Sequence, residues 1–273
     1  MSTLTQHGSR LGETREELDL PATGAGFEPG RARGAEARAL LDRDGAVILD
    51  GLPREPDSLV LAAAEVLGTR LSRLYPVRER GSDRGDHIAL HNDSHHIAVD
   101  VHGRTTRLRD PDEDYVLLQV VRQAEAGAAS VIVDGYRALD AIRDAHPDLW
   151  NFLTTVDVDF YGAWDPVRGV PTTPQVCRHV EWTRAGRRIV RANQGARPVW
   201  RGQAVHEAWA QRQEAMLDLF ADLRATIAAG APRVRLNDGE ILFLDNYRCW
   251  HGRDPHDTPR LVNIMTVRTT DAM

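Results

Sequence analysis

Short apolar runs bounded by turn-forming residues recur along the whole chain. Runs of four to eight apolar residues closed by Gly, Pro, Asp or Asn are typical of strands buried in a sheet. The segment 115–121 (YVLLQVV) is apolar on nearly every residue, which indicates a strand that is buried on both faces. The same criterion predicts strands at 46–49, 87–91, 115–121, 130–134, 187–191, 240–244 and 260–267.

Helical periodicity is confined to a few segments between these runs. The longest predicted helix covers 206–229 and ends at Gly230. Its apolar stripe repeats near the helical period and consists of Trp209, Met216, Phe220, Leu223 and Ile227. Shorter helices are expected at 35–41, 58–67 and 136–146, the last of them stopped by Pro147. The Arg-rich segment 72–86 is broken by proline and glycine, so we expect a loop there.

This order of elements predicts a mainly β protein with inserted helices. Many short strands favour a double-sheet barrel of the jelly-roll kind, a double-stranded β-helix with a cupin-like core. Residues 1–34 show little periodicity and are expected to form an N-terminal arm or a lid. Residues 35–273 are expected to form one domain, with a helical and loop insert at about 140–230.

Composition narrows the class of protein. The 273 residues are 42% hydrophobic, which suffices for a sizeable core. A net charge of -6 does not favour binding to nucleic acid or to an anionic membrane, since both are negatively charged. Two cysteines suit reduced thiols, and no segment has the pattern of a signal peptide or a membrane span. We therefore expect a cytoplasmic protein that acts on a small molecule, with the oligomeric state left open.

Metal chemistry is indicated by His91-Asn92-Asp93 together with the distant segment 245–251. Residues two apart on an extended strand point to the same side of the sheet. His251 can add a second imidazole from another strand. Two imidazoles and one carboxylate on one face of a metal leave coordination positions open and suit non-haem Fe(II) that activates oxygen.

Two other classes remain open at this point. A His-x-Asp pair is common by chance, and His87, His95, His96 and His102 also lie nearby. The cluster could belong to a zinc or manganese hydrolase, although the usual two-metal loop, His-x-His-x-Asp-His, does not fit the segment 91–96 (HNDSHH). A jelly-roll module that binds a ligand without catalysis is the other alternative.

Taken together, the sequence blocks resemble the Fe(II)/2-oxoglutarate-dependent dioxygenases of the TauD/TfdA-like (clavaminate synthase-like) group. The resemblance extends over about 45–268, which is most of the chain. The blocks that carry it follow the family's order and are 89–94 (ALHNDS), 115–121, 125–130 (EAGAAS), 134–135 and 239–253.

The resemblance implies a role for individual positions. His91, Asp93 and His251 would ligate Fe(II). Arg260 would hold the distal carboxylate of 2-oxoglutarate, because a planar guanidinium grips a carboxylate with two parallel hydrogen bonds. Ser130 stands where family members often have a threonine whose hydroxyl helps to hold the same carboxylate. With O₂ as the second cosubstrate, the implied reaction is hydroxylation of an unactivated C–H bond.

The chain also departs from the family pattern. Gly127-Ala128-Ala129 replaces the usual Gly-Gly, and Ile264 stands where some members carry a second arginine for an anionic substrate. A sulfonate held in that manner is therefore not expected. Because related halogenases lack the carboxylate, Asp93 favours hydroxylation, with desaturation, cyclisation or epoxidation as alternatives on the same scaffold.

The substrate is expected to be a small polar metabolite. The chain is short for the resembled group, which favours a free amino acid or a derivative, within specialised metabolism such as antibiotic biosynthesis. The segment 72–86, the residues after Asp93 and the central insert are expected to line the cavity. The residues proposed to contact substrate are His95, His96, Tyr161, Trp164, Arg248 and Arg268.

Overall fold

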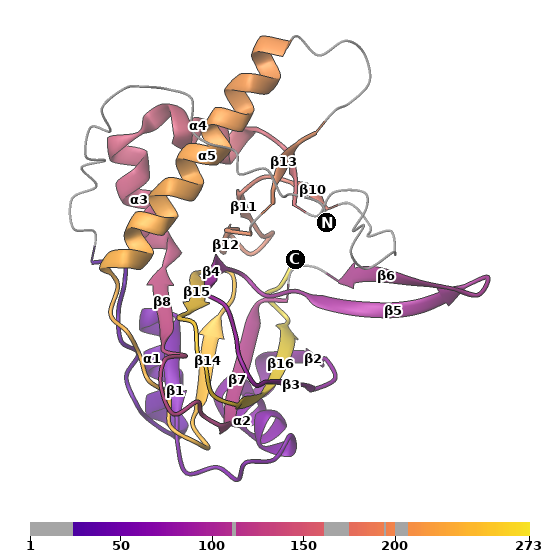
Figure 1. The fold of residues 1–273 in the computed structure, drawn as a ribbon, viewed down its shortest axis with the longest axis vertical. Helices are drawn as coiled ribbons and strands as arrows, with labels where there is room; N and C mark the ends of the chain where they lie inside the picture. Colours follow the sequence, from indigo (N-terminus) through magenta and orange to yellow (C-terminus); the bar gives the residue numbers. More distant parts are fainter. Residues whose placement is uncertain (1–23, 111–112, 161–174, 194, 200–206) are drawn as a thin grey trace.

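The computed structural model describes residues 24–110, 113–160, 175–193, 195–199 and 207–273. Two antiparallel sheets dominate this part of the chain (Figure 1). The larger, six-stranded sheet has the order β1-β14-β7-β16-β2, and β3 also pairs with β16. Its strands are β1 (Ala46–Leu49), β14 (Ile241–Asp245), β7 (Tyr115–Arg122), β16 (Arg260–Thr269), β2 (Leu71–Leu74) and β3 (Arg78–Ser82).

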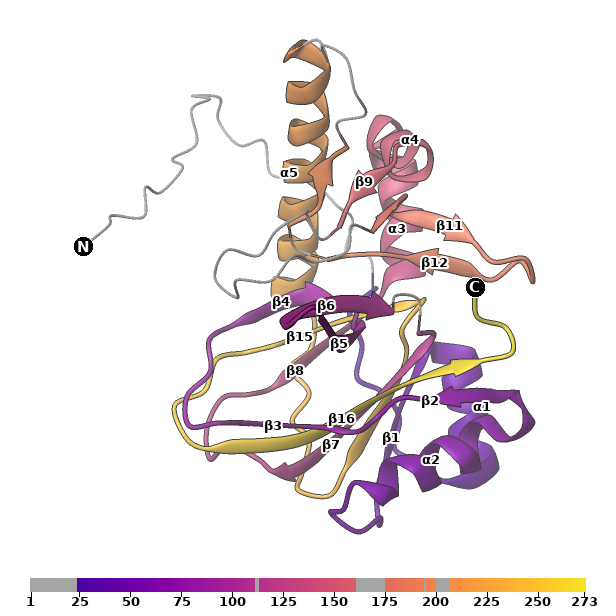
Figure 2. The ribbon, with the colours of Figure 1, turned by 90° about the vertical axis from the view of Figure 1, so that its right-hand side faces the viewer.

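The smaller, three-stranded sheet has the order β4-β15-β8. Its strands are β4 (Ile88–His91), β15 (Cys249–Arg253) and β8 (Ser130–Asp134). Figure 2 shows this sheet lying over the larger one. The space between them is filled by apolar residues of both sheets, among them Ile48, Ile132 and Leu242.

Helices cover the outer face of each sheet. Against the larger sheet pack α1 (Gly34–Asp44) and α2 (Asp57–Leu67), which is followed by the short 3₁₀ helix η1 (Gly68–Arg70). Against the smaller sheet pack α3 (Gly135–Ala145), α4 (Pro147–Thr155) and α5 (Glu207–Gly230). Strands in the middle layers are therefore apolar on both faces: Ala46 and Ile48 of β1 face the other sheet, whereas Val47 and Leu49 face the helices.

Smaller strand pairs complete the described structure. A hairpin of β5 (His95–Val101) and β6 (Arg104–Asp110) extends away from the two sheets (Figure 1). Near α4 and α5 lie β9 (Val158–Asp159), β10 (Val176–Cys177), β11 (Val180–Trp182), β12 (Arg188–Val190) and β13 (Arg197–Pro198). In the described part of the chain, no helix combines the length and the apolar character that crossing a membrane requires.

The strands and helices predicted from the sequence are confirmed, with ends that differ by a few residues. Three features differ. The expected loop 72–86 contains most of β2 and all of β3, which pair with β16 although their sequence is polar. Pro147, expected only to stop a helix, also starts α4, because a proline at the first helical position sacrifices no hydrogen bond.

The third difference is the β5–β6 hairpin, which was not predicted because its sequence has no clear apolar run. Its turn places His102 and Gly103 at φ 51° and 74°, and consecutive positive φ angles are typical of a tight hairpin turn. The predicted arm 1–34 lies partly outside the described residues. Its described end pairs with both sheets, through isolated bridges from Gly26 to Val133 and from Arg31 to Ile48.

Candidate metal centre

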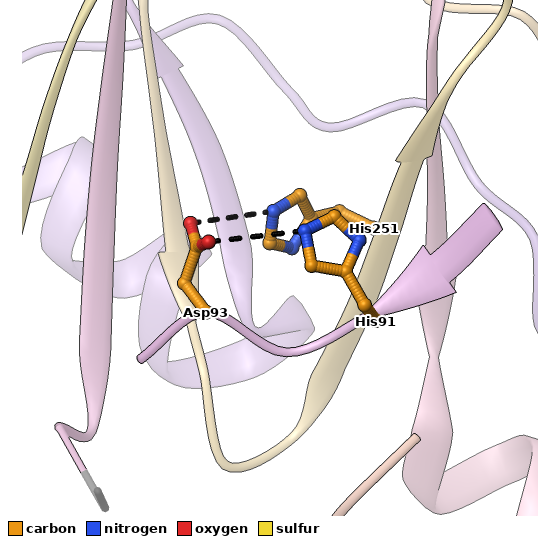
Figure 3. Close-up of side chains that lie close together, drawn as sticks. All are labelled: His91, Asp93 and His251. Atoms are coloured by element: carbon orange, nitrogen blue, oxygen red, sulfur yellow. Dashed lines mark ion pairs between the residues drawn. The ribbon is translucent and has the colours of Figure 1, made fainter. Parts of the chain in front are cut away.

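The structure brings His91, Asp93 and His251 together at the edge of the smaller sheet (Figure 3). His91 ends β4 and is the cross-strand partner of His251 on β15, while Asp93 follows β4 by two residues. Their potential ligand atoms all lie within 4.8 Å of one another. The Asp93 carboxylate lies 3.8 Å from His91 Nε2 and 3.6 Å from His251 Nε2. These separations exceed a normal hydrogen bond, so the three groups face one another without closing the space between them.

The hydrogen bond of His91 fixes the nitrogen that it can offer to a metal. His91 Nδ1 lies 3.0 Å from the carbonyl oxygen of Ala89. A carbonyl only accepts, so Nδ1 carries the proton and the Nε2 lone pair points toward Asp93. His251 Nδ1 is buried and has no hydrogen-bond partner in the described part of the chain. This pattern suits a metal bound through the Nε2 atoms.

Burial and mutual proximity set the charges of the three groups. Burial alone would raise the pKa of Asp93, but the adjacent imidazoles of His251 and His91 hold that pKa well below its usual range. Burial lowers the pKa of His251, and the neighbouring His91 lowers it further. Burial would also lower the pKa of His91, but the neighbouring Asp93 carboxylate raises it overall. An ionised carboxylate beside imidazoles is the donor set of a divalent transition metal.

Two asparagines hold the segment that carries His91 and Asp93. Asn246, in the turn between β14 and β15, accepts from the backbone N–H of Asp93 at 3.0 Å and donates to its carbonyl at 3.0 Å. Asn92 donates to the carbonyls of Asn246 and Cys249 at 2.7 and 3.3 Å. The turn that precedes His251 is thereby tied directly to the segment that contains the other two metal-site residues.

The three residues open into a cavity of about 310 Å³ between the sheets. Ser130 at the start of β8 and Arg260 at the start of β16 line the same cavity. The five residues proposed for metal and cosubstrate therefore surround one space, although they come from four separate segments. Much of the remaining wall is apolar and consists of Leu118, Leu242, Val262 and Ile264.

Arg260 brings an uncompensated positive charge to this cavity. It is only 5% exposed, and its Nε donates to Gln123 Oε1 at 3.2 Å. No carboxylate among the described residues pairs with it. Burial and the nearby Arg253 lower its pKa to about 10. A buried charge of this kind is costly without a counterion, so the cavity favours an anionic ligand.

The proposed substrate residues have different outcomes. His95 and His96 lie on β5, but the structure does not describe their side chains. Tyr161 and Trp164 lie outside the described residues. These four assignments stay predictions.

Arg248 and Arg268 do not reach the cavity. Arg248 forms a 2.6 Å ion pair with the buried carboxylate of Asp134 and donates to the Arg43 carbonyl. Arg268, near the end of β16, is paired with β2 and donates to the carbonyl of Met273. Acceptors outside this cavity therefore hold both guanidinium groups in this structure, and their expected contacts with substrate stay predictions.

The strand β3 contributes residues that sequence reasoning did not single out. Arg80 and Ser82 line the cavity, as the general expectation for segment 72–86 implied. Arg78 donates to the carbonyl of Ser94 at 3.5 Å, while its Nε and Nη2 are buried and have no partner among the described residues. The sequence of β3 does not alternate between apolar and polar residues, so its pairing with β16 could not be predicted. For the same reason, the sequence did not indicate which side chains of β3 face the cavity.

Comparisons with known proteins agree with this geometry. The sequence profile of the family described as "Taurine catabolism dioxygenase TauD, TfdA family" matches residues 14–268. No curated protein matches the chain.

Several solved structures share the fold at low sequence identity. One is PvcB from Pseudomonas aeruginosa, with 14% identity and a TM-score of 0.56, over 92% of this chain and 81% of that chain. Another is a putative alpha-ketoglutarate-dependent taurine dioxygenase from Burkholderia xenovorans, with 14% identity and a TM-score of 0.60, over 91% and 89%. A taurine dioxygenase from the same organism has 15% identity and a TM-score of 0.57, over 86% and 80%.

The family match covers nearly the whole chain, including every residue of the metal cluster and its cavity. The chain therefore belongs to the TauD/TfdA family and is an Fe(II)/2-oxoglutarate-dependent dioxygenase by family and fold.

Proposed function

We propose that this protein hydroxylates an unactivated C–H bond of a small polar metabolite, namely a free amino acid or a derivative. The observation that carries the proposal is one cavity that holds both a His-Asp-His cluster and a buried, uncompensated arginine. The cluster suits Fe(II), and the arginine suits the distal carboxylate of 2-oxoglutarate.

His91, Asp93 and His251 would hold the iron, which, when bound, supplies oxygen activation coupled to oxidation of 2-oxoglutarate to succinate and carbon dioxide. The fit rests on their donor atoms. The tautomer of His91 leaves Nε2 free, and the carboxylate is held ionised between two imidazoles. Three protein ligands leave positions open for two cosubstrates.

Arg260 and Ser130 would orient 2-oxoglutarate. The guanidinium would donate to the distal carboxylate, and the hydroxyl of Ser130 would supply a further donor. Both side chains are almost completely buried, at 5% and 6% exposure, so the bonds would form with little competition from water.

The cavity favours a small substrate. Its volume of about 310 Å³ is at the low end for ligand pockets, and 2-oxoglutarate would occupy part of it. Polar contacts for the substrate would come from Arg80 and Ser82, which line the cavity. Arg78, which donates to the carbonyl of Ser94, would supply a further positive charge. PvcB, which shares this fold, is described as an Fe, alpha-ketoglutarate dependent oxygenase from an isonitrile synthetic pathway. That description is compatible with a role for the present protein in specialised metabolism.

The architecture proposed for this activity is the double-stranded β-helix of the family, built from the two sheets. Within it, residues 1–34 would act as an arm or lid, and the insert at about 140–230 would help to enclose the substrate.

Succinate release tests the proposal. The full-length protein is incubated with Fe(II), 2-oxoglutarate and O₂, and a panel of free amino acids is added one at a time. We expect slow succinate formation that one class of amino acid accelerates, with a product 16 mass units heavier. Loss of two mass units would instead identify a desaturase or cyclase on the same scaffold. Turnover supported by Zn(II) without 2-oxoglutarate or O₂ would overturn the proposal in favour of a hydrolase.

A further inference from the structure

A second cavity, of about 560 Å³, lies on the outer side of the smaller sheet. Strand β4 forms one wall, and helix α5 forms another through Phe220 and the small residues Ala221, Ala225 and Ala228. Ile88 and Gly252 line both this cavity and the metal cavity. The strands β4 and β15 therefore separate the two spaces, and a ligand here would not meet the metal.

Arg224 gives this second cavity a buried positive charge. The residue is 8% exposed, and no carboxylate among the described residues pairs with it. Its Nε donates to the Phe220 carbonyl at 3.4 Å, and Nη1 donates to the carbonyls of Leu90 and Ala192. Nη2 donates to no group in the described structure. Burial lowers the pKa of Arg224 to about 10, so the guanidinium remains charged at neutral pH and lacks an anion.

His179 lines the same cavity and carries a buried polar atom. It is 1% exposed, and its Nδ1 lies 2.9 Å from the Arg191 carbonyl, so that nitrogen carries the proton. Nε2 is therefore an acceptor, and it is buried without a partner among the residues that the structure describes. Burial lowers the pKa of His179 to about 3, which keeps the ring neutral. A buried acceptor of this kind can take a hydrogen bond from water or from a ligand group.

The two polar groups flank one aromatic ring. The Arg224 guanidinium lies 4.8 Å from the centroid of Phe220, and the His179 ring lies 5.0 Å from it. A ligand beside Phe220 can therefore meet a cation and an acceptor while its body contacts apolar wall. The exposed Asp218 also lines the cavity but forms no ion pair with Arg224.

We propose that this cavity binds a small amphipathic acid. Its anionic group accepts from Arg224 Nη2, a hydroxyl or N–H donates to His179 Nε2, and an apolar skeleton fills the space beside α5. The volume is that of a pocket for a ligand of drug size. The site stands independently of the oxygenase activity, because the residues that form its polar contacts do not line the metal cavity.

The test uses 6-hydroxy-2-naphthoate, a fluorescent acid with a hydroxyl group, titrated into the full-length protein. We expect saturable binding, and 2-naphthol, which lacks the carboxylate, should bind about tenfold or more weakly because the charge-assisted bond is lost. Ala225→Phe fills the cavity from an exposed helix position and should weaken binding of the acid by about tenfold or more. Ala215→Phe, at an exposed position of α5 that does not line the cavity, should stay within about twofold.

The location is tested by competition. Saturating Zn(II) and 2-oxoglutarate should leave the affinity for the naphthoate unchanged, because the metal cavity is a separate space. The proposal is overturned if binding is not saturable up to about 1 mM, a weak affinity even for a small ligand. It is equally overturned if Ala225→Phe binds as tightly as the unmodified protein, or if Zn(II) and 2-oxoglutarate displace the probe.

Discussion

At the scale of single residues, Arg260 is buried, and no carboxylate of the described chain pairs with its charge. Arg260→Met keeps an apolar chain of similar length and removes the charge. The proposed role predicts about 10- to 100-fold weaker binding of 2-oxoglutarate, since hydrogen bonds to charged groups contribute about 1.5–3 kcal/mol. Calorimetric titration of 2-oxoglutarate into the Zn(II)-loaded protein measures the change.

The control for this substitution is Arg184→Met, because Arg184 is exposed and does not line the cavity. It should leave the affinity unchanged. Arg260→Met itself should not lower the stability of the ligand-free protein much, because it removes a buried charge that has no counterion. Equal affinity for 2-oxoglutarate in both variants would exclude Arg260 as its anchor.

His179 predicts a distinct dependence of stability on pH. Its folded pKa of about 3 lies below the unfolded value of 6.5, because burial disfavours the charged ring and the charges of Arg224 and Arg191 oppose it further. As pH falls, His179 therefore takes up a proton in the unfolded chain before it does so in the folded protein. Its contribution to the free energy of unfolding is complete above pH 6.5 and is lost progressively toward pH 3. Between pH 7 and 5 the loss should be about 2 kcal/mol.

The test compares chemical denaturation at pH 7 and 5. His179→Asn retains a donor for the Arg191 carbonyl and cannot titrate, so its free energy of unfolding should fall by about 2 kcal/mol less over this interval. His102→Asn, at an exposed turn position with positive φ, is the matched control and should behave like the unmodified protein. Parallel pH dependences in all three proteins would refute the assignment.

The residues of the site differ in how far the sequence could predict them. His91, Asp93, His251, Arg260 and Ser130 were expected together because each belongs to a recognisable block, and the structure places them around one cavity. The partner of Arg248 was not predictable, because Asp134 is a distant residue that only the folded chain brings within 2.6 Å. Proximity along the sequence to His251 said nothing about the side of the strand on which its guanidinium lies.

At the scale of elements, the turn between β14 and β15 links the two sheets and positions both ends of the metal site. Asn246 in this turn is 5% exposed and bonds to both backbone groups of Asp93 and to the carbonyl of Glu113. Asn246→Ala should cost about 2–4 kcal/mol of stability, because buried backbone groups lose their partners. It should also weaken Zn(II) binding about 10- to 100-fold, as is typical for residues that support metal ligands.

Urea denaturation and competition with a metal chelator measure these two effects. Asn151→Ala on α4 is the control, because Asn151 is exposed and the hydroxyls of Thr154 and Thr155 bond to its backbone carbonyl, which the substitution keeps. An Asn246→Ala protein with unchanged Zn(II) affinity would show that the turn does not hold the metal site in place.

Elements with a strong apolar pattern were predictable, and the others were not. Strands such as β1 and β14 lie between two layers and are buried on both faces. Their sequences are therefore nearly continuous apolar runs, which can be recognised without a structure. In contrast, β3 has no fully buried residue, and its pairing depends on the backbone of β16. Backbone pairing with a neighbouring strand leaves no trace in local sequence, and for this reason the loop expected at 72–86 proved to contain strands.

At the scale of the whole molecule, three apolar clusters lie in series: α1 and α2 on one sheet, the space between the sheets, and α3 to α5 on the other sheet. The metal site lies at the middle layer and joins β4 to β15. A metal that binds only the folded state should therefore stabilise the whole molecule.

Zn(II) at a concentration of about 100 times its dissociation constant should raise the free energy of unfolding by about 2.7 kcal/mol. This corresponds to a rise in melting temperature of roughly 5–10 °C for a protein of this size. Asp93→Ala should lose most of that rise, and Glu55→Ala, an exposed carboxylate substitution, should keep it. Differential scanning calorimetry with and without a chelator measures the effect, and an equal rise in Asp93→Ala would argue against this metal site.

The central claim is that one cavity holds Fe(II) on His91, Asp93 and His251 and holds 2-oxoglutarate against Arg260. Anaerobic titration with Fe(II) and 2-oxoglutarate tests it most directly. The account predicts a weak visible absorption band from the chelated complex, which shifts when the correct substrate is added and is missing in Asp93→Ala. The absence of any band in the unmodified protein, or an identical band in Asp93→Ala, would contradict the claim.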